Sequence, residues 1–297
     1  MARIAHLTDL HLLEPRPHRR GSRERLRLGF LSFGRPLDAG DRRARFRRAL
    51  QAVAASGADH LLLTGDLTED GMAAQFEALA EELLDGPVPP ERITLLPGNH
   101  DAYADDGAWE RALAGPLRPF AGTSAPKAVV PLDDGTVVVP VSTRMHQPFT
   151  RAAGRVPAGD VAKVEGVLAS RDHRHGTVIV GIHHPPVPHP LPGGRWLDGI
   201  ENLEAARRPL LSDPRVHVLH GHTHRRTDQP LTRGGRRRVF STTACVESPR
   251  PLRLYEAREG TLAPLPLVPM APPIDQAGRT GGRPGKIPEA PPAASWG

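Results

Sequence analysis

Short apolar runs that stop at potential metal-binding side chains constrain the fold of this chain more than any other feature. The clearest run ends in a Pro-Gly turn (residues 93–98), and Asn99, His100 and Asp101 follow it directly. In open α/β sheets, ligands bind beyond the carboxyl ends of the strands, so an amide, an imidazole and a carboxylate at this place indicate a polar site. The stretch alone is equally compatible with a turn followed by a helix cap, so the other runs decide its interpretation.

Four other apolar runs end in the same way. Residues two apart on an extended chain project to the same side, so the two Asp/His or His/His pairs among them are expected to point together. It is improbable that five strands end in this way by accident. The potential ligand atoms are oxygen and imidazole nitrogen, and no thiolate is among them, so they favour Mn, Fe, Zn or Co over a structural zinc cluster. The side chains that end these four runs are Asp9 and His11, Asp66, His183, and His222 and His224.

Two further histidines belong to the same strands. His6 lies inside the first predicted strand and is interpreted as a packed side chain. His184 directly follows His183, and adjacent side chains on an extended chain diverge. We therefore assign His183 to the metal site and His184 to a supporting or substrate-contacting position.

Composition limits the class of protein. The 297 residues are enough for one large domain or two small ones, and the formal net charge is +6. A basic protein can meet phosphates, nucleic acid or an anionic membrane, although the charge can also serve solubility alone. Cys245 is the only cysteine, so no disulfide forms within the chain. Neither a secretory signal nor an apolar run of about 18 residues is found, so a cytoplasmic enzyme without a transmembrane helix is expected.

The segment between the first two runs is dense in arginine. We interpret about residues 14–40 as an insertion that forms a loop or a short helical lid. A helix capped by Asp41 is expected to follow it. The arginines could grip phosphates or lie on an anionic lipid surface. The alternative, a solvated basic face with a small apolar anchor, is the one we favour for most of them.

The rest of the chain alternates helix and strand patterns. We expect one catalytic domain over residues 1–262, followed by a Pro-rich tail, 263–297, that is disordered because it lacks hydrophobic periodicity. Apolar residues at helical or strand spacing predict helices over 72–84, 107–113, 157–170 and 202–211, a hairpin over 129–139, and strands over 216–219, 239–243 and 252–255.

The polar motifs together resemble the motif set of the calcineurin-like metallophosphoesterases over about residues 3–245. The resemblance implies an α/β fold, a four-layer α/β/β/α sandwich of two mixed sheets flanked by helices. It also implies two divalent metal ions. The motifs that carry the resemblance are Asp9-x-His11, Gly65-Asp66, Gly98-Asn99-His100-Asp101, His183 and Gly221-His222-x-His224.

The resemblance also assigns a role to each site residue. His100 would lie beside the metals and contact the phosphate or the leaving group, and Asp101 could orient His100 or cap the next helix. Asp66 would bridge the two ions. One ion would be held by Asp9, His11, Asp66 and His224, and the other by Asp66, Asn99, His183 and His222.

The implied reaction is hydrolysis of a small phosphodiester by a hydroxide held between the two cations. The stretch 183–186 resembles the bacterial cyclic nucleotide phosphodiesterase and glycerophosphodiesterase branch. The arginine-rich insertion departs from that branch and leaves room for a lipid-like or nucleic-acid substrate. His100 argues against the lipid A pathway pyrophosphatases, which usually carry arginine there. The alternatives are a phosphomonoesterase, a nuclease, a non-catalytic scaffold, or a nucleic-acid or anionic-membrane binding protein without hydrolysis.

Overall fold

The computed structural model describes residues 1–132, 134–232, 234–235 and 238–266. Of the predicted tail, residues 267–297 lie outside this part. Residues 261–264 form the last strand, β11 (Thr261–Pro264), which pairs antiparallel with β10 (Arg253–Arg258). Among the described residues no helix is both long and apolar enough to cross a membrane.

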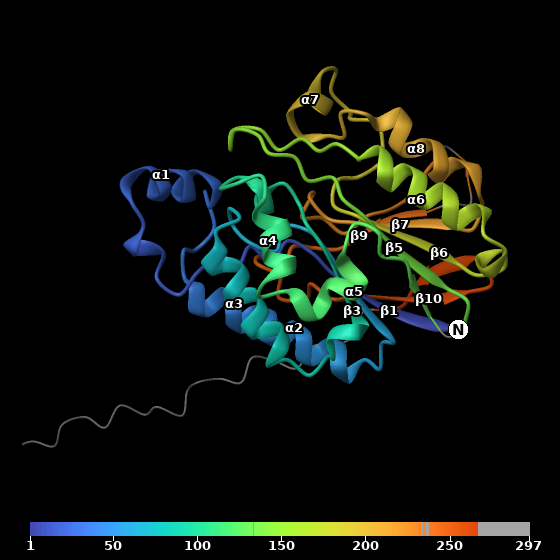
Figure 1. Ribbon diagram of the computed structural model, residues 1–297, viewed down its shortest axis with the longest axis horizontal. Helices are drawn as coiled ribbons and strands as arrows, with labels where there is room; N and C mark the ends of the chain where they lie inside the picture. The colour runs from blue at the N-terminus through green and yellow to red at the C-terminus, as the bar shows by residue number, and fades with distance from the viewer. Residues whose placement is uncertain (133, 233, 236–237, 267–297) are drawn as a thin grey trace, which may run out of the picture.

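Two mixed β-sheets form the centre of the molecule (Figure 1). The first sheet has the order β11-β10-β1-β2-β3, and the second has the order β4-β5-β6-β7-β9-β8. Most strands are parallel within each sheet, so their carboxyl ends meet at one edge. The other strands are β1 (Ala2–Leu7), β2 (His60–Thr64), β3 (Ile93–Leu96), β4 (Val130–Pro131), β5 (Val137–Val141), β6 (Val178–Ile182), β7 (Val216–His220), β8 (Asp228–Pro230) and β9 (Arg238–Ser241).

Helices cover the outer faces of both sheets. In Figure 1, α2 and α3 lie below the strands, and α6 and α8 lie above them. The four helices predicted from periodicity are present, as α3, α4, α6 and α8. All helices are α1 (Ser22–Leu31), α2 (Ala39–Ala55), α3 (Ala73–Leu84), α4 (Ala108–Ala114), α5 (Ala121–Ser124), α6 (Ala158–Ala169), α7 (Gly194–Asp198) and α8 (Leu203–Ser212).

Three apolar clusters hold these layers together. Alternate residues of a strand enter different clusters, as β2 shows: Leu61 and Leu63 pack under the helices, and Leu62 packs between the sheets. Strands buried on both faces therefore need continuous apolar runs, which explains why the runs in this sequence do not alternate. The expected four-layer α/β/β/α sandwich is confirmed.

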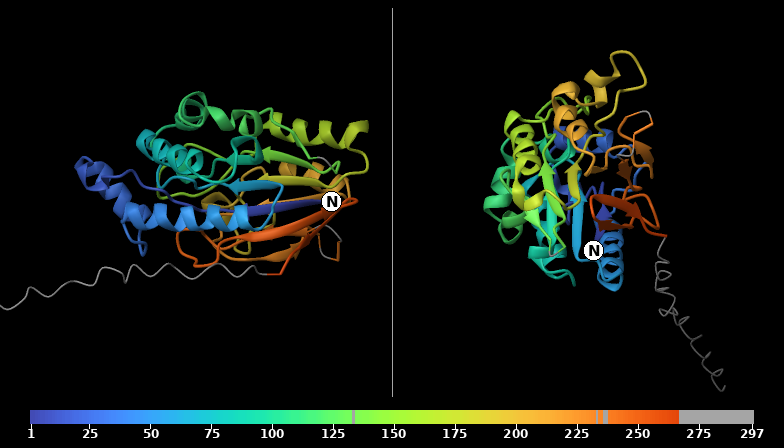
Figure 2. Two further views of the ribbon diagram at one scale, coloured as in Figure 1. Left: turned by 90° about the horizontal axis from the view of Figure 1, so that it is seen from below. Right: turned by 90° about the vertical axis from the view of Figure 1, so that its right-hand side faces the viewer.

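The arginine-rich insertion is only in part the solvated basic face that is expected for most of its arginines, since Arg16, Arg19, Arg23 and Arg25 are exposed. Its helix α1 projects from the left end of the molecule in Figure 1 and in the left view of Figure 2, yet other arginines of the insertion are buried or half-buried in ion pairs. Arg20 pairs with Glu14 and Asp70, and Arg27 also pairs with Asp70. These carboxylates are buried and must be compensated, which is why these particular arginines turn inward.

The cap of α2 also differs from the prediction. The helix begins at Ala39, and Asp38 is its N-cap, with a side-chain oxygen 3.0 Å from the backbone nitrogen of Asp41. Asp41 instead lies in the first turn, where its charge favours the helix dipole and pairs with Arg45. The predicted cap residue was therefore three positions too late.

Candidate metal centre

The predicted ligands lie in loops just beyond the strands and not on the strands themselves. Strand β1 ends at Leu7 and β7 ends at His220, so neither two-residue pair is on extended backbone. The expectation that extended geometry aligns these pairs was wrong. Their backbone is left-handed, an arrangement that is unfavourable for side chains other than glycine. The residues concerned, all with φ between 47° and 68°, are Asp9, His11, Asp66, His222 and His224.

Backbone contacts between the loops hold this geometry. The amide nitrogens of Asp9 and His11 donate to the carbonyl oxygens of Gly65 and Asp66, at 3.1 and 2.9 Å. The loops after β1 and β2 therefore run together. Glycine is required beside Asp66, because a Cβ at Gly98 would lie 2.2 Å from Asp66 Oδ1.

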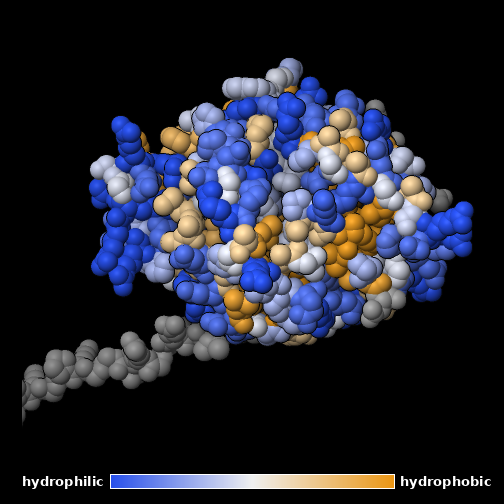
Figure 3. All heavy atoms as spheres, in the orientation of Figure 1, coloured by the Kyte–Doolittle hydropathy of each residue, from blue (hydrophilic) through white to orange (hydrophobic). Residues whose placement is uncertain are grey.

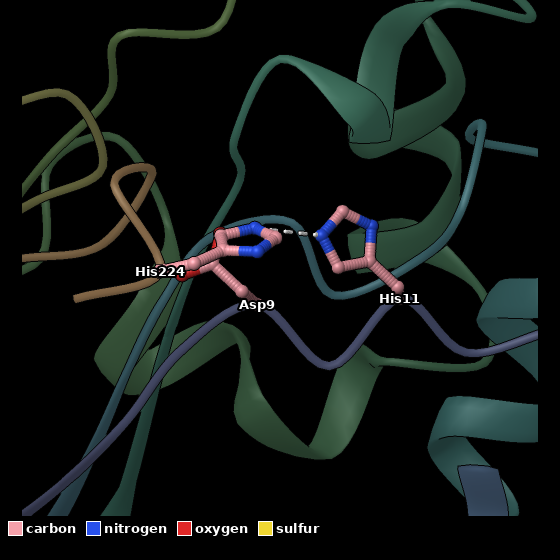
Figure 4. A group of neighbouring side chains, drawn as sticks. All are labelled: Asp9, His11 and His224. Atoms are coloured by element: carbon pink, nitrogen blue, oxygen red, sulfur yellow. Dashed lines mark hydrogen bonds and ion pairs between the residues drawn. The ribbon is translucent and has the colours of Figure 1, made fainter. Parts of the chain in front are cut away.

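Asp9, His11 and His224 form the first group of side chains (Figure 4). One ligand atom of each lies within 4.8 Å of the others. The Nε2 atoms of His11 and His224 face each other at 3.4 Å, and His224 Nε2 is 3.3 Å from Asp9 Oδ1. Loops far apart in the sequence, after β1 and β7, thus converge on one point.

Asp66, His183 and His222 form the second group, again with ligand atoms within 4.8 Å. His183 Nε2 lies 3.2 Å from Asp66 Oδ2 and 3.2 Å from Asn99 Oδ1. The amide and the carboxylate therefore flank one imidazole nitrogen. The structure brings together all seven side chains that the sequence predicts as ligands.

Asp66 lies between the two groups. Its Oδ2 atom is 3.2 Å from His183 Nε2 in the second group and 4.0 Å from His11 Nε2 in the first. Its Oδ1 atom accepts a hydrogen bond from the backbone nitrogen of His100 at 2.9 Å. One carboxylate oxygen is thereby fixed, and the other faces both clusters.

A backbone carbonyl holds the second ring nitrogen of two of the histidines, His183 and His222. His183 Nδ1 is 2.7 Å from the Thr64 carbonyl oxygen, and His222 Nε2 is 2.9 Å from the Asp198 carbonyl oxygen. A carbonyl accepts only from a protonated nitrogen, so in the neutral form of these two rings the opposite nitrogen carries the lone pair. This arrangement is typical of histidines that bind metal.

Charge within the centre displaces the pKa values of its histidines. Burial lowers the pKa of His183, but the adjacent Asp66 carboxylate outweighs it and raises the value to about 9. The pKa of His224 rises to about 10, because the attraction of Asp9 and Glu247 exceeds the effect of burial. His222, which is buried and lies near His183, has its pKa lowered to about 4. In the metal-free chain, protons therefore neutralise part of the carboxylate charge.

The residues fit divalent cations. Apart from the approach of His224, the buried Asp9 Oδ1 atom has no hydrogen-bond partner among the described residues. The two groups offer carboxylate, amide and imidazole donors, which suit Mn, Fe, Zn or Co. Two carboxylates buried side by side are unfavourable unless positive charge compensates them. Cations at this place would supply that charge.

His100 and Asp101, the predicted catalytic residues, occupy different positions. His100 Nε2 faces the centre, 3.9 Å from Asp66 Oδ2, and His100 Nδ1 is 2.6 Å from the Glu69 carbonyl oxygen. Asp101 is fully buried, and its carboxylate accepts hydrogen bonds from the backbone nitrogens of Leu67, Thr68 and Gly98 and from the hydroxyl of Thr68. The Glu69 carbonyl therefore orients His100, and Asp101 ties the loops after β2 and β3 together.

The two other histidines considered from the sequence are both fully buried. His184 Nδ1 is 2.7 Å from the Thr143 hydroxyl, and His184 Nε2 is 2.8 Å from the Ala152 carbonyl oxygen. Its ring packs against that of His222, with centroids 4.3 Å apart. His184 therefore helps to position a predicted ligand and is not itself one of the ligands. His6 Nε2 contacts the Thr64 hydroxyl at 2.8 Å, as expected of a packed strand residue.

Sequence reasoning missed the residues that surround the ligands. The buried Glu69 carboxylate pairs with Arg35 and Arg42 and lies 3.8 Å from His11 Nδ1. Arg35 Nη1 also lies 3.2 Å from His11 Nε2. The only signal of Glu69 in the sequence was the acidic pair Glu69-Asp70, three and four residues after Asp66. Nothing in the sequence pointed to Glu247, which comes from a distant loop to meet His224 at 2.9 Å.

The sequence of this chain matches those of known proteins. The family model of the calcineurin-like phosphoesterases matches residues 2–226. A probable cyclic nucleotide phosphodiesterase from Pseudoalteromonas sp. (strain SM9913) is 28% identical over 229 residues, which cover 75% of this chain and 71% of the relative. The 3',5'-cyclic adenosine monophosphate phosphodiesterase CpdA from Vibrio vulnificus (strain CMCP6) is 26% identical over 64% of this chain and 62% of the relative.

Solved structures show the same fold. A dimetal phosphatase from Danio rerio superimposes with a TM-score of 0.62 at 13% identity, covering 89% of this chain and 98% of that one. A protein from Thermus thermophilus gives a TM-score of 0.51 at 14% identity, with 89% and 97% covered. The family match spans most of the chain, including every predicted ligand. The chain therefore belongs to the calcineurin-like phosphoesterase family of metal-dependent phosphoester hydrolases.

Proposed function

We propose that this protein hydrolyses a small phosphodiester with the help of two divalent cations. The observation that carries the proposal is the position of Asp66, whose Oδ2 atom faces both groups of ligand atoms, 3.2 Å from His183 and 4.0 Å from His11. A shared carboxylate is what two closely spaced cations require. The two relatives named as cyclic nucleotide phosphodiesterases support a diester as the substrate class.

The predicted ligands then divide into two sets around Asp66. Asp9, His11 and His224 are the first set, and Asn99, His183 and His222 are the second. Two cations held there would neutralise charge on the phosphate and lower the pKa of bound water.

His100 is the group that moves or holds a proton. Its Nδ1 atom is fixed by the Glu69 carbonyl oxygen, so its Nε2 atom is aimed at the centre. A protonated Nε2 can donate to the departing ester oxygen or to an equatorial phosphate oxygen. Asp101 acts through the loops that carry Asp66 and His100, and so serves as a positioning residue.

Arg35, a residue of the insertion, brings a positively charged guanidinium group to the centre. Its Nη2 atom pairs with Glu69 at 2.7 Å, its Nη1 atom faces the centre beside His11, and its Nε atom is buried without a hydrogen-bond partner in the described structure. A guanidinium with donors left over binds phosphate oxygens well. Arg35 would therefore hold the substrate phosphate from the side of the insertion.

One assay tests the proposal. Metal-reconstituted protein is given bis(p-nitrophenyl) phosphate or p-nitrophenyl phosphate, with chelator-treated protein as the control. We expect diester turnover that is lost with the metal. Turnover of the monoester alone would make the protein a phosphomonoesterase, and the absence of metal-dependent turnover of either ester would contradict hydrolysis.

A further inference from the structure

Most of the large apolar side chains that the described structure exposes lie in two segments. The first is the insertion, where Leu26 is 75% and Phe33 92% exposed. The second surrounds α7, where Trp196 is 64% exposed. Exposed apolar groups gathered in this way mark interaction sites on soluble folds. The insertion surface consists of Leu26, Phe30, Phe33 and Leu37, and the α7 surface of Leu191, Trp196 and Leu197.

Both segments border the metal centre. The insertion follows β1 and the α7 segment follows β6, so both leave the edge where the parallel strands end. Each also contacts a predicted ligand: Arg35 reaches His11 at 3.2 Å, and the Asp198 carbonyl oxygen reaches His222 at 2.9 Å. A partner that binds these surfaces is therefore brought next to the site of hydrolysis.

The insertion surface is presented by an anchored helix. Arg20 and Arg27 fasten α1 to the buried Asp70, and Leu28 packs inward. Leu26 and Phe30, four residues apart on α1, share one side of the helix. Both are exposed, although the ring of Phe30 also contacts that of Phe149, with centroids 5.2 Å apart. The exposure of this stripe is thus fixed by ion pairs beneath it.

The same surface carries positive charge. Arg16, Arg19, Arg23 and Arg25 are all exposed, and no ion pair or hydrogen bond of their side chains is found within the described ranges. Figure 3 shows strongly hydrophilic side chains over α1, at the left of the view. Cationic side chains around an apolar stripe are the features with which proteins bind anionic membrane interfaces.

We propose that the insertion surface and the α7 surface dock this protein onto an anionic phospholipid bilayer. Leu26, Phe33 and Trp196 would enter the boundary between headgroups and acyl chains, while the exposed arginines contact lipid phosphates. Nucleic acid is the less suitable partner, because it would engage the arginines and leave the apolar side chains in water. Docking places the metal centre at the lipid surface, where phosphodiester headgroups are concentrated.

Vesicle co-sedimentation tests this proposal. Full-length protein is mixed with vesicles of phosphatidylcholine alone, or of phosphatidylcholine with phosphatidylglycerol. We expect binding to the anionic vesicles, weakened by salt. The double variant Leu26→Ser/Phe33→Ser should bind at least about tenfold more weakly, because two apolar side chains no longer enter the interface. Trp196→Ser should also weaken binding.

The matched control is Leu84→Ser, which removes an exposed leucine from the end of α3. We expect it to bind vesicles as wild type does, and all variants should keep wild-type turnover of bis(p-nitrophenyl) phosphate and wild-type thermal stability. Equal binding by wild type and the double variant would overturn the proposal. So would binding to a single-stranded oligonucleotide without binding to vesicles.

Vesicle binding is measured without turnover, so its failure is distinguishable from failure of the proposed hydrolysis. Protein that cleaves the soluble diester but ignores anionic vesicles contradicts only the docking surface. Protein that binds vesicles without metal-dependent cleavage contradicts only the proposed reaction.

Discussion

Backbone strain is concentrated on the predicted ligands. Of the six non-glycine residues with positive φ that the structure describes, all but Glu259 are predicted metal ligands. Such a conformation costs about 1–3 kcal/mol for most residues and persists only where the surroundings impose it. For Asp9, His11 and Asp66, the paired loops after β1 and β2 impose it. The strained backbone carries the side chains that converge on the metal centre beyond the ends of the parallel strands.

Replacing Asp66 with alanine tests its bridging position. Because its Oδ2 atom faces both ligand groups, Asp66→Ala should lose metal from both sites and not from one. Metal content per chain after desalting is measured by elemental analysis. Retention of one full equivalent of metal would show that Asp66 serves a single site.

Replacing His100 separates catalysis from metal binding. Its Nδ1 atom bonds a backbone carbonyl and its Nε2 atom faces Asp66 Oδ2 at 3.9 Å, so His100→Ala should keep its metal and lose about 10²–10⁴-fold in kcat. The matched control, exposed His18→Ala, should turn over diester as wild type does. Normal kcat in His100→Ala would remove this residue from the mechanism.

At the residue scale, the sequence predicted side chains whose chemistry is distinctive and missed those whose role is purely spatial. Asp9, Asn99 and His183 were predictable because a polar donor directly follows an apolar run. The Asp198 carbonyl could not be predicted, since a backbone atom carries no signal in the sequence. Glu247 is exposed in part and lies 23 residues from its partner His224, so only the folded chain brings them together.

Elements were predicted where apolar periodicity determines burial. Helices α3, α6 and α8 appeared within two residues of their predicted bounds. The insertion was predicted only in part, because Arg16, Arg19, Arg23 and Arg25 face water, as charge runs usually do. The buried Glu14, Asp70 and Glu69 draw Arg20, Arg27 and Arg35 inward. A sequence does not reveal in advance which carboxylates will be buried.

The anchoring of α1 can be tested with two arginines of the same segment. Arg20→Ala leaves the buried Glu14 without its arginine and the buried Asp70 with Arg27 alone, which should lower the free energy of unfolding by about 3–5 kcal/mol. Exposed Arg25→Ala should change it by less than about 0.5 kcal/mol. Urea unfolding measures both, and equal effects would show that the buried ion pairs do not stabilise the insertion.

The fit between the loops after β2 and β3 depends on the absence of a side chain. Gly98→Ala would place Cβ 2.2 Å from Asp66 Oδ1, so Asp66 must shift. We expect lower metal content and a loss of about 1–3 kcal/mol in unfolding free energy. Gly122→Ala in α5, where a Cβ meets nothing within 4 Å, is the control. Wild-type metal content in Gly98→Ala would contradict this tight fit.

At the scale of the molecule, the fold could be predicted through its family resemblance, but the pairing of strands could not. The order β11-β10-β1-β2-β3 joins the two ends of the domain in one sheet. Long-range pairing of this kind leaves no local pattern, because each strand is simply apolar on both faces. The convergence of the metal centre follows from that pairing.

Histidines buried in the sheets make global stability depend on pH. Burial lowers the pKa of His60, which contacts Thr94, to about 4, against 6.5 in the unfolded chain. The unfolded state therefore binds more protons between these values, and this contribution is fully present above pH 6.5 and lost as pH falls toward 4. This contribution of His60 to the free energy of unfolding is on the order of 1–3 kcal/mol.

Urea unfolding at pH 7 and pH 5 measures this effect. His60→Gln should lose less stability than wild type between the two pH values, because glutamine does not titrate. His175→Ala, at an exposed position, should follow the wild-type curve. Parallel curves for wild type and His60→Gln would contradict the assignment.

The most direct measurement of the central claim is anomalous diffraction from crystals of the manganese-loaded protein. The account predicts two peaks about 3.5–4 Å apart, one beside Asp9, His11 and His224, the other beside Asn99, His183 and His222, with Asp66 between them. A single peak, or peaks away from these side chains, would contradict it.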